Sequence, residues 1–245
     1  MPSNPKKTSK LSLSSRRHQA ASFESSSKVI SGTSLTSPLF IPIVGLVLFF
    51  WFSYRSLFSF PVWFDESLGK AIFFGLPVWL YVVMTGARQI VETLDWSRFK
   101  RGLWLGIAIG GIFGFAGAIL AAWQRGGTIQ PAMLFQSDSF WYEFGLALLT
   151  AFWETLFFFS FIQTIIQGRL KSWPWLNQAM LVAAIFLVFH VPNAILRFNG
   201  AAIGQQLFLL FFFGLGQALL FTREKNAFAL ILSHAIWGMV LLVHF

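Results

Sequence analysis

The chain has 245 residues, of which 56% are hydrophobic and only 11% charged, and it contains no cysteine. Soluble domains carry about 25% charged residues, so this composition favours a membrane protein. The missing cysteines exclude disulfides, thiol nucleophiles and Cys-ligated metal centres. The net charge of +9 is confined to one tail and to loops between apolar segments. This distribution predicts membrane lipids as partners, through anionic headgroups, and no nucleic acid.

Residues 1–37 differ from the rest of the chain because they are rich in Ser, basic and nearly free of aromatic residues. Such a segment cannot bury enough apolar surface to offset the entropy of ordering, so we predict a disordered tail. A Ser-rich, Arg-containing, acid-poor start also fits an organellar transit peptide. Residues 38–245 are predicted to form one membrane domain.

Seven apolar segments follow, each near the roughly 20 residues that cross a hydrocarbon core. They predict an all-α, polytopic membrane helix bundle with seven transmembrane helices, at 38–54, 69–86, 103–123, 141–163, 178–196, 204–222 and 226–244. In the third segment Gly106, Gly110 and Gly114 recur every four residues. This spacing lets helix backbones approach closely, so we expect a packed helix there.

The basic residues predict an orientation. Fourteen of the 18 Lys and Arg residues lie in the tail and in the second, fourth and sixth connections. The opposite side holds Arg55, Lys70, Arg125 and Arg197. Because cytoplasmic segments carry the excess of basic residues, the N-terminus is predicted to be cytoplasmic. A bacterial plasma membrane or thylakoid-type membrane is the first expectation for this multi-pass protein, and an organellar membrane the second.

Polar side chains inside the predicted spans are the candidate functional residues. Glu154 lies in "AFWETLFFFSF" of the fourth segment, His190 and Asn193 lie in the fifth, and His234 lies in the seventh. Ionisable groups within a membrane are rare, face the protein interior and mark functional sites. We therefore predict that Glu154, His190 and His234 converge on one polar cavity. The alternative is three separate structural hydrogen bonds.

These residue types can activate water. A carboxylate can act as general base on a water molecule, and a histidine can share the proton or donate to a developing oxyanion. Alternatively, Glu154, His190 and His234 are the ligand set of a catalytic zinc ion with an open water position. Either arrangement leads to hydrolysis. The residues alone leave the choice between a metal-free site and a zinc site open.

The order of these elements resembles the CPBP family of intramembrane proteases, also called the Abi or CAAX-protease family. Its members carry Glu-Glu-x-x-x-Arg, Phe-x-x-x-His and His-x-x-x-Asn or Asp on consecutive membrane helices. The second motif is intact from Phe186 to His190. His234 matches the third motif, but Gly238 stands where Asn or Asp belongs. The resemblance covers residues 140–245.

The first motif is eroded. If Glu154 is its second Glu, Trp153 replaces the first Glu and Phe158 the Arg. If Glu154 is its first Glu, Thr155 replaces the second Glu and Phe159 the Arg. Either alignment lacks one Glu and the Arg. Since that Arg is the expected ion-pair partner, we expect Glu154 to be unpaired and protonated at neutral pH.

The resemblance implies an endopeptidase that hydrolyses a membrane-associated peptide or protein with glutamate-activated water. Glu154 and His190 would act on the water, and His234 would donate to the oxyanion. Asn193 and Phe186 would support them. The eroded motifs favour a second hypothesis, a catalytically degenerate binding or scaffold protein of the same fold. A third hypothesis is a proton-coupled small-solute transporter, for which Glu and His relays are typical, although no internal repeat is evident.

Overall fold

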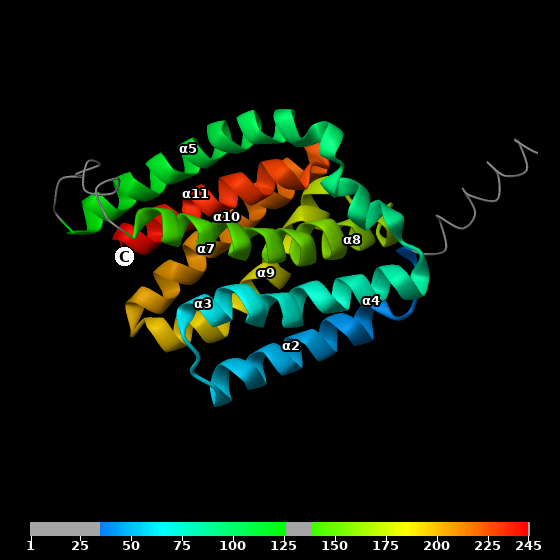
Figure 1. The fold of residues 1–245 in the computed structure, drawn as a ribbon, viewed down its shortest axis with the longest axis horizontal. Coiled ribbons are helices and arrows are strands. Elements are labelled where there is room, and N and C mark those ends of the chain that lie inside the picture. The colour runs from blue at the N-terminus through cyan, green and yellow to red at the C-terminus, as the bar shows by residue number, and fades with distance from the viewer. Residues whose placement is uncertain (1–34, 126–138, 245) are drawn as a thin grey trace, which may run out of the picture.

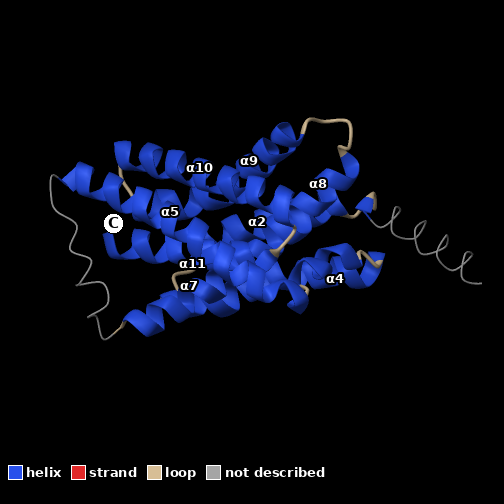
Figure 2. Ribbon diagram, turned by 90° about the horizontal axis from the view of Figure 1, so that it is seen from above, coloured by secondary structure: helices blue, strands red, loops and turns tan. Residues whose placement is uncertain are grey.

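All regular structure in the described residues, 35–125 and 139–244 of a computed structural model, is helical (Figure 2). This confirms the predicted all-α class. Most of the predicted disordered tail, residues 1–34, lies outside the described residues. Its last residues are described, and the guanidinium of Arg169 donates hydrogen bonds to the carbonyl oxygens of Leu35 and Ser37.

The helices follow the predicted apolar segments in order. Those of the first half are α2 (Phe40–Leu57), α3 (Val62–Phe64), the π-helical segments η1 (Asp65–Gly69) and η2 (Ala71–Gly75), α4 (Leu76–Thr85), the 3-10 segments η3 (Arg88–Leu94) and η4 (Trp96–Arg98), and α5 (Phe99–Arg125). Those of the second half are α7 (Phe140–Glu154), the π-helical η5 (Thr155–Gln163), α8 (Thr164–Arg169), α9 (Trp175–Arg197), α10 (Ala201–Glu224) and α11 (Ala227–His244).

Six of the helical runs within the described residues are long and apolar enough to cross a membrane. They are Phe40–Leu57, Val62–Thr85, Arg88–Ile119, Phe140–Arg169, Trp175–Arg197 and Ala201–Glu224. Ala227–Met239 is a shorter apolar stretch within α11. These lengths and compositions make the chain a multi-pass integral membrane protein. Its orientation and the kind of membrane stay predictions.

The helices form a bundle in which the two halves of the chain pack against each other (Figure 1). α5 lies along α11, and α9 lies against α10. α7 contacts α11 on one side and the η1 and η2 segments on the other. The α5–α11 contact depends on small residues, since a Cβ at Gly106 or Gly110 would come within 3 Å of α11 atoms. This is the close packing expected from the glycine spacing.

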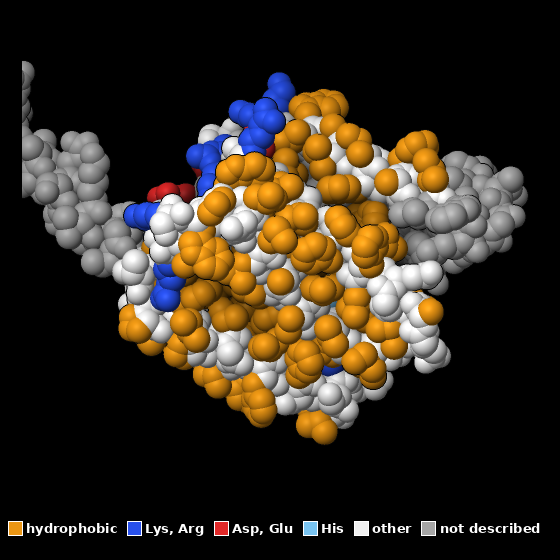
Figure 3. Space-filling model, turned by 180° about the vertical axis from the view of Figure 1, so that it is seen from behind, with side chains coloured by type: hydrophobic (Ala, Val, Ile, Leu, Met, Phe, Trp, Pro, Cys, Tyr) orange, Lys and Arg blue, Asp and Glu red, His pale blue; other side chains and the backbone are white. Residues whose placement is uncertain are grey.

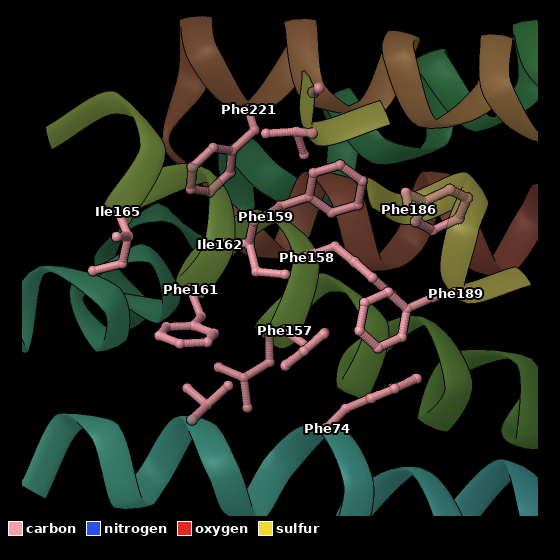
Figure 4. Close-up of a cluster of buried hydrophobic side chains, with 14 of the residues drawn as sticks. Phe74, Phe157, Phe158, Phe159, Phe161, Ile162, Ile165, Phe186, Phe189 and Phe221 are labelled. Carbon is pink, nitrogen blue, oxygen red and sulfur yellow. The ribbon is translucent and has the colours of Figure 1, made fainter. Parts of the chain in front are cut away.

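An aromatic cluster fills the centre of the bundle (Figure 4). Three consecutive phenylalanines of η5, Phe157, Phe158 and Phe159, are fully buried there. They pack against Phe74 of η2 and Phe186 of α9. The cluster therefore joins η5 to both halves of the chain, and it fixes the helix that carries Glu154.

The outer surface is largely apolar. Figure 3 shows hydrophobic side chains over most of one face, with Lys and Arg side chains gathered near its edge. Large side chains such as Ile41 and Val83 are more than half exposed. Contiguous apolar surface of this extent needs an apolar partner. The lipid bilayer is that partner for a bundle of membrane-spanning helices.

Candidate active site

A cavity of about 620 Å³ opens between η1 and helices α7, α9, α10 and α11. Most of its wall is apolar, but several polar and charged side chains converge on one side of it. Those side chains are Glu66, Lys70, Thr150, Glu154, His190, Asn193, Arg197 and His234. Cavities of this size with a few convergent polar groups are typical of ligand and substrate sites.

The structure brings Glu154, His190 and His234 together from three different helices. Glu154 ends α7 and is 3% exposed. Its Oε2 atom lies 3.4 Å from Nε2 of His190 and 3.3 Å from Nε2 of His234. One carboxylate oxygen therefore faces two imidazoles at the cavity wall. This is the convergence that the polar residues within the spans predicted, while their catalytic roles stay predictions.

The two histidines differ in how their second ring nitrogen is held. Nδ1 of His190 lies 2.7 Å from the carbonyl oxygen of Phe186, so it carries a proton and donates to that oxygen. Nδ1 of His234 is buried and has no hydrogen-bond partner among the described residues. In its neutral form His190 therefore turns a lone pair toward Glu154 Oε2. Nε2 of His190 can therefore share a proton that Oε2 accepts.

Glu154 has a cationic partner, contrary to expectation. The ammonium of Lys70 donates to Glu154 Oε1 at 2.6 Å, although the two residues are 84 positions apart. Lys70 is only 3% exposed. The expected unpaired, protonated carboxyl group is therefore wrong, because an ammonium at this distance favours the carboxylate. Each oxygen of Glu154 has a different neighbour, the lysine on Oε1 and the histidines on Oε2.

The same lysine binds a second carboxylate. Lys70 Nζ also donates to Glu66 Oε2, one helical turn earlier in the chain. The hydroxyl of Thr150 donates to the same oxygen at 2.7 Å. The guanidinium of Arg197 lies 3.9 Å from Glu66 Oε1. Lys70 is thus enclosed by two carboxylates, one from its own helix and one from α7.

Lys70 was counted among the charges outside the membrane, because the second span was predicted to start only one residue before it, at residue 69. The helical run that contains it begins at Val62, so Lys70 lies inside a membrane helix and not in a connection. A lysine and two acids near the end of an apolar segment resemble a polar boundary in the sequence. The signal that could have placed them is the four-residue spacing of Glu66 and Lys70, which sets both on one helix face.

Comparison with known families gives a match that includes the two histidines and Glu154. Residues 136–240 match the model of the family described as type II CAAX prenyl endopeptidase Rce1-like. These residues form an Rce1-like domain of the CPBP family. The match confirms the resemblance seen in the motifs. Neither the search of curated proteins nor that of solved structures gives a match to the chain.

The Rce1-like domain contains Glu154, His190 and His234, but neither Glu66 nor Lys70. Within it, the two positions that depart from the first motif when Glu154 is its second Glu are used for packing. The ring of Trp153 lies against Gly75 of η2, where an added Cβ would meet the ring at 2.5 Å. Phe158 is fully buried among aromatic side chains, 5.0 Å from Phe186 and 5.3 Å from Phe189 between ring centroids. An Arg at that position would have to displace this cluster.

The other residues singled out from the sequence lie at the cavity or beside its histidines. Asn193 lines it, and its Oδ1 atom has no hydrogen-bond partner among the described residues. The ring of Phe186 packs on His190 with centroids 4.1 Å apart. Gly238 lines the cavity one turn after His234, and a Cβ there would meet no atom within 4 Å. A Cβ at this position is therefore accommodated without moving another described atom.

The zinc alternative stays a prediction. Among the described residues, no group of three or more His, Asp and Glu side chains is arranged to hold a metal ion. Glu154 also has one oxygen bonded to the ammonium of Lys70. We therefore derive no step through a metal.

Proposed function

We propose that the protein is an intramembrane endopeptidase that hydrolyses a membrane-associated peptide with water activated by Glu154. The observation that carries this proposal is the position of Glu154 Oε2, within 3.4 Å of two imidazole nitrogens at the wall of a cavity. Family membership supports a peptide or protein substrate. The family's printed name makes a prenylated peptide with a CAAX C-terminus the first substrate to test.

The geometry supports a division of labour among the three residues. Glu154 Oε2 takes a proton from the attacking water as the water oxygen bonds to the carbonyl carbon of the peptide. His190 shares that proton with Glu154, because its Nδ1 is held by Phe186 and its Nε2 faces Oε2. His234 donates from Nε2 to the developing oxyanion. The proton then passes to the leaving nitrogen as the C–N bond breaks.

The apolar wall of the cavity and the surrounding aromatic cluster complete this chemistry. Phe186 and Phe213 lie against the two imidazoles, with ring centroids 4.1 Å from His190 and 4.9 Å from His234. Such walls limit the water that reaches the reacting atoms and strengthen electrostatic interactions inside. A transmembrane peptide segment can supply the apolar side chains that fit them.

One observation favours a second candidate, a binding or scaffold protein without catalysis. Gly238 leaves the site one side-chain donor short of the family pattern. Losing one oxyanion donor typically lowers the rate about 10²–10³-fold. The two candidates differ in a single measurable property, which is whether the wild-type protein turns over any peptide.

The test is peptide cleavage by purified protein in lipid-containing micelles. The substrates are a fluorogenic prenylated CAAX peptide and a library of membrane peptides, with products identified by mass spectrometry. We expect Glu154→Gln to lower kcat by about 10³-fold, and His190→Ala and His234→Ala by about 10²-fold. Glu143→Gln is the matched control, because Glu143 lines the same cavity but bonds to Ser139 and not to the histidines.

Two outcomes would overturn the peptidase proposal. The first is that the wild-type protein cleaves none of the substrates, while wild type and Glu154→Gln bind them with the same affinity. This outcome would support the scaffold protein. Cleavage that persists at the wild-type rate in all three variants would place the reaction elsewhere or in a contaminant.

A further inference from the structure

We propose that Lys70 and Glu66, which lie outside the Rce1-like domain, are the positioning residues of its active site. In this proposal Lys70 holds Glu154 ionised and aligned, in place of the Arg that the domain lacks. Glu66 holds Lys70. The inference rests on the proposed function, because positioning has a purpose only if Glu154 acts on water.

The first step is the contact between Lys70 and Glu154. Their 2.6 Å hydrogen bond fixes Glu154 Oε1 and leaves Oε2 as the oxygen that faces both histidines. Both side chains are about 4% exposed, so water does not screen the pair. A charge-assisted bond of this kind sets both the charge and the direction of a carboxylate.

The second step is the support of Lys70 itself. An isolated ammonium inside a membrane helix is strongly disfavoured. Glu66 supplies a second negative charge from the same helix, and Thr150 of α7 holds the oxygen that Lys70 binds. Thr150 and Glu154 are one helical turn apart on α7. Lys70 and Glu66 therefore bridge α7 and the α3–α4 helix at the level of the reactive carboxylate.

The neighbouring acid shows that this arrangement is specific. Asp65 precedes Glu66 in the same π-helical segment, yet its carboxylate binds Tyr54 and Arg55 of α2. Asp65 is absent from the cavity wall, which Glu66 lines. Asp65 thus joins η1 to α2 at a place outside the site. Glu66, the next residue, binds Lys70 at the cavity wall. Asp65 is the matched control for Glu66.

A positioning role predicts a particular kinetic pattern. Substrate binding depends on the apolar wall, so KM should change little when Lys70 is altered. The rate should fall, because Glu154 loses both its charge partner and its alignment. A residue that only stabilises the fold would reduce the amount of active protein and leave kcat per active site unchanged.

The kinetic experiment compares four variants of the full chain. We expect Lys70→Gln to lower kcat about 10²-fold with KM within about threefold of wild type. Lys70→Arg keeps the charge and should retain kcat within about tenfold. Glu66→Gln should lower kcat about tenfold. Asp65→Asn should change kcat less than about twofold. Active-site concentration is set by the fraction of folded protein, measured by size-exclusion chromatography.

A second experiment tests the ion pair of Lys70 and Glu154 without an activity measurement. Dicyclohexylcarbodiimide reacts with protonated carboxyl groups in apolar surroundings, and mass spectrometry locates the adduct. We expect little labelling of Glu154 in wild type and in Lys70→Arg, and strong labelling in Lys70→Gln. In the Glu66→Gln variant, Glu154 should be labelled weakly, because Lys70 stays beside it. Because the Lys70→Arg and Glu66→Gln variants keep a buried ion pair, they test the proposal even if Lys70→Gln does not fold.

The outcomes separate this inference from the proposed function. Equal labelling of Glu154 in wild type and Lys70→Gln, or equal kcat in the Glu66→Gln, Lys70→Gln and Asp65→Asn variants, would overturn the positioning role. An inert wild type with the expected labelling pattern would overturn the peptidase function, and with it the catalytic purpose of the pair. Loss of kcat in Lys70→Gln with rescue by Lys70→Arg would support both.

Discussion

The two halves of the bundle contribute different things to one site. The second half, from α7 to α11, carries the carboxylate and the two histidines, and its residues 136–240 match a protease family. The first half lies outside that match over α2 to α4, yet its Lys70 bonds to the same carboxylate. The comparison teaches that a motif match locates the reactive groups, while the groups that hold them can lie in another part of the chain.

The difference has a physical origin in the aromatic cluster. Phe158, which stands at the Arg of the motif if Glu154 is its second Glu, is fully buried and packs against both halves. Trp153, which stands at the first Glu in the same alignment, packs on Gly75. The second half therefore uses these positions to dock the first half. This packing brings Lys70 of the first half to Glu154. The ion pair with Lys70 then takes the place of the ion pair that the Arg of the motif would make.

The largest effect is expected from removing Lys70, the cation that Glu66 and Glu154 share. Lys70→Met leaves two buried carboxylates, Glu66 and Glu154, without their ammonium. We expect the free energy of unfolding to fall by about 3–5 kcal/mol, the typical loss when one partner of a buried ion pair is removed. Denaturant titration in detergent micelles, followed by tryptophan fluorescence, measures the change.

The control for this change is an exposed ion pair. Arg101 is 73% exposed at its side chain and pairs with Glu224. Arg101→Gln should lower the free energy of unfolding by less than about 1 kcal/mol. Similar losses in the two variants would mean that Lys70 is not enclosed as the structure shows.

The helices could be predicted from the sequence, but the link between the halves could not. Runs of apolar residues predicted every long helix, because crossing a membrane requires about 20 of them. The polar residues within the spans also predicted which side chains meet. Lys70 was missed because its partner Glu154 is 84 positions away, and a single sequence carries no record of contacts at that distance. The docking role of Trp153 was missed for the same reason.

The contact between the halves can be weakened without touching a charge. Gly75→Val places side-chain atoms where the ring of Trp153 lies, since a Cβ alone would come within 2.5 Å of it. Overpacking of this kind typically lowers stability by about 1–3 kcal/mol. We expect that loss, together with a fall in kcat as η2 and Lys70 move away from Glu154. The same micelle titration and the peptide assay measure both.

Gly45 provides the matched control for Gly75. It lies on α2, and a Cβ there would meet no atom within 4 Å. Gly45→Val should leave both stability and kcat close to wild type. If the two valine variants behave alike, the Trp153 contact is not what joins the halves.

The catalytic contribution of the second half can be tested separately by restoring the third motif. Gly238→Asn adds an amide one turn after His234, at a position on the cavity wall where a Cβ meets no atom within 4 Å. We expect kcat to rise about tenfold, less than the 10²–10³-fold typical of an oxyanion donor, because the rest of the site evolved without it. Gly238→Leu, of similar size but without a donor, should not raise kcat. An equal rise in both variants would point to packing and not to hydrogen bonding.

Removal of metal is expected to change the cleavage rate least of all. The experiment decides whether Lys70 of the first half or a metal ion balances the charge of the Glu154 carboxylate. If Lys70 is the cation of the site, a chelator should change the cleavage rate less than about twofold. The purified protein should contain less than about a tenth of a zinc ion per chain. If zinc were held by Glu154, His190 and His234, chelation would abolish cleavage and zinc would restore it. The first half would then stabilise the fold alone, because the metal, and not Lys70, would balance the carboxylate.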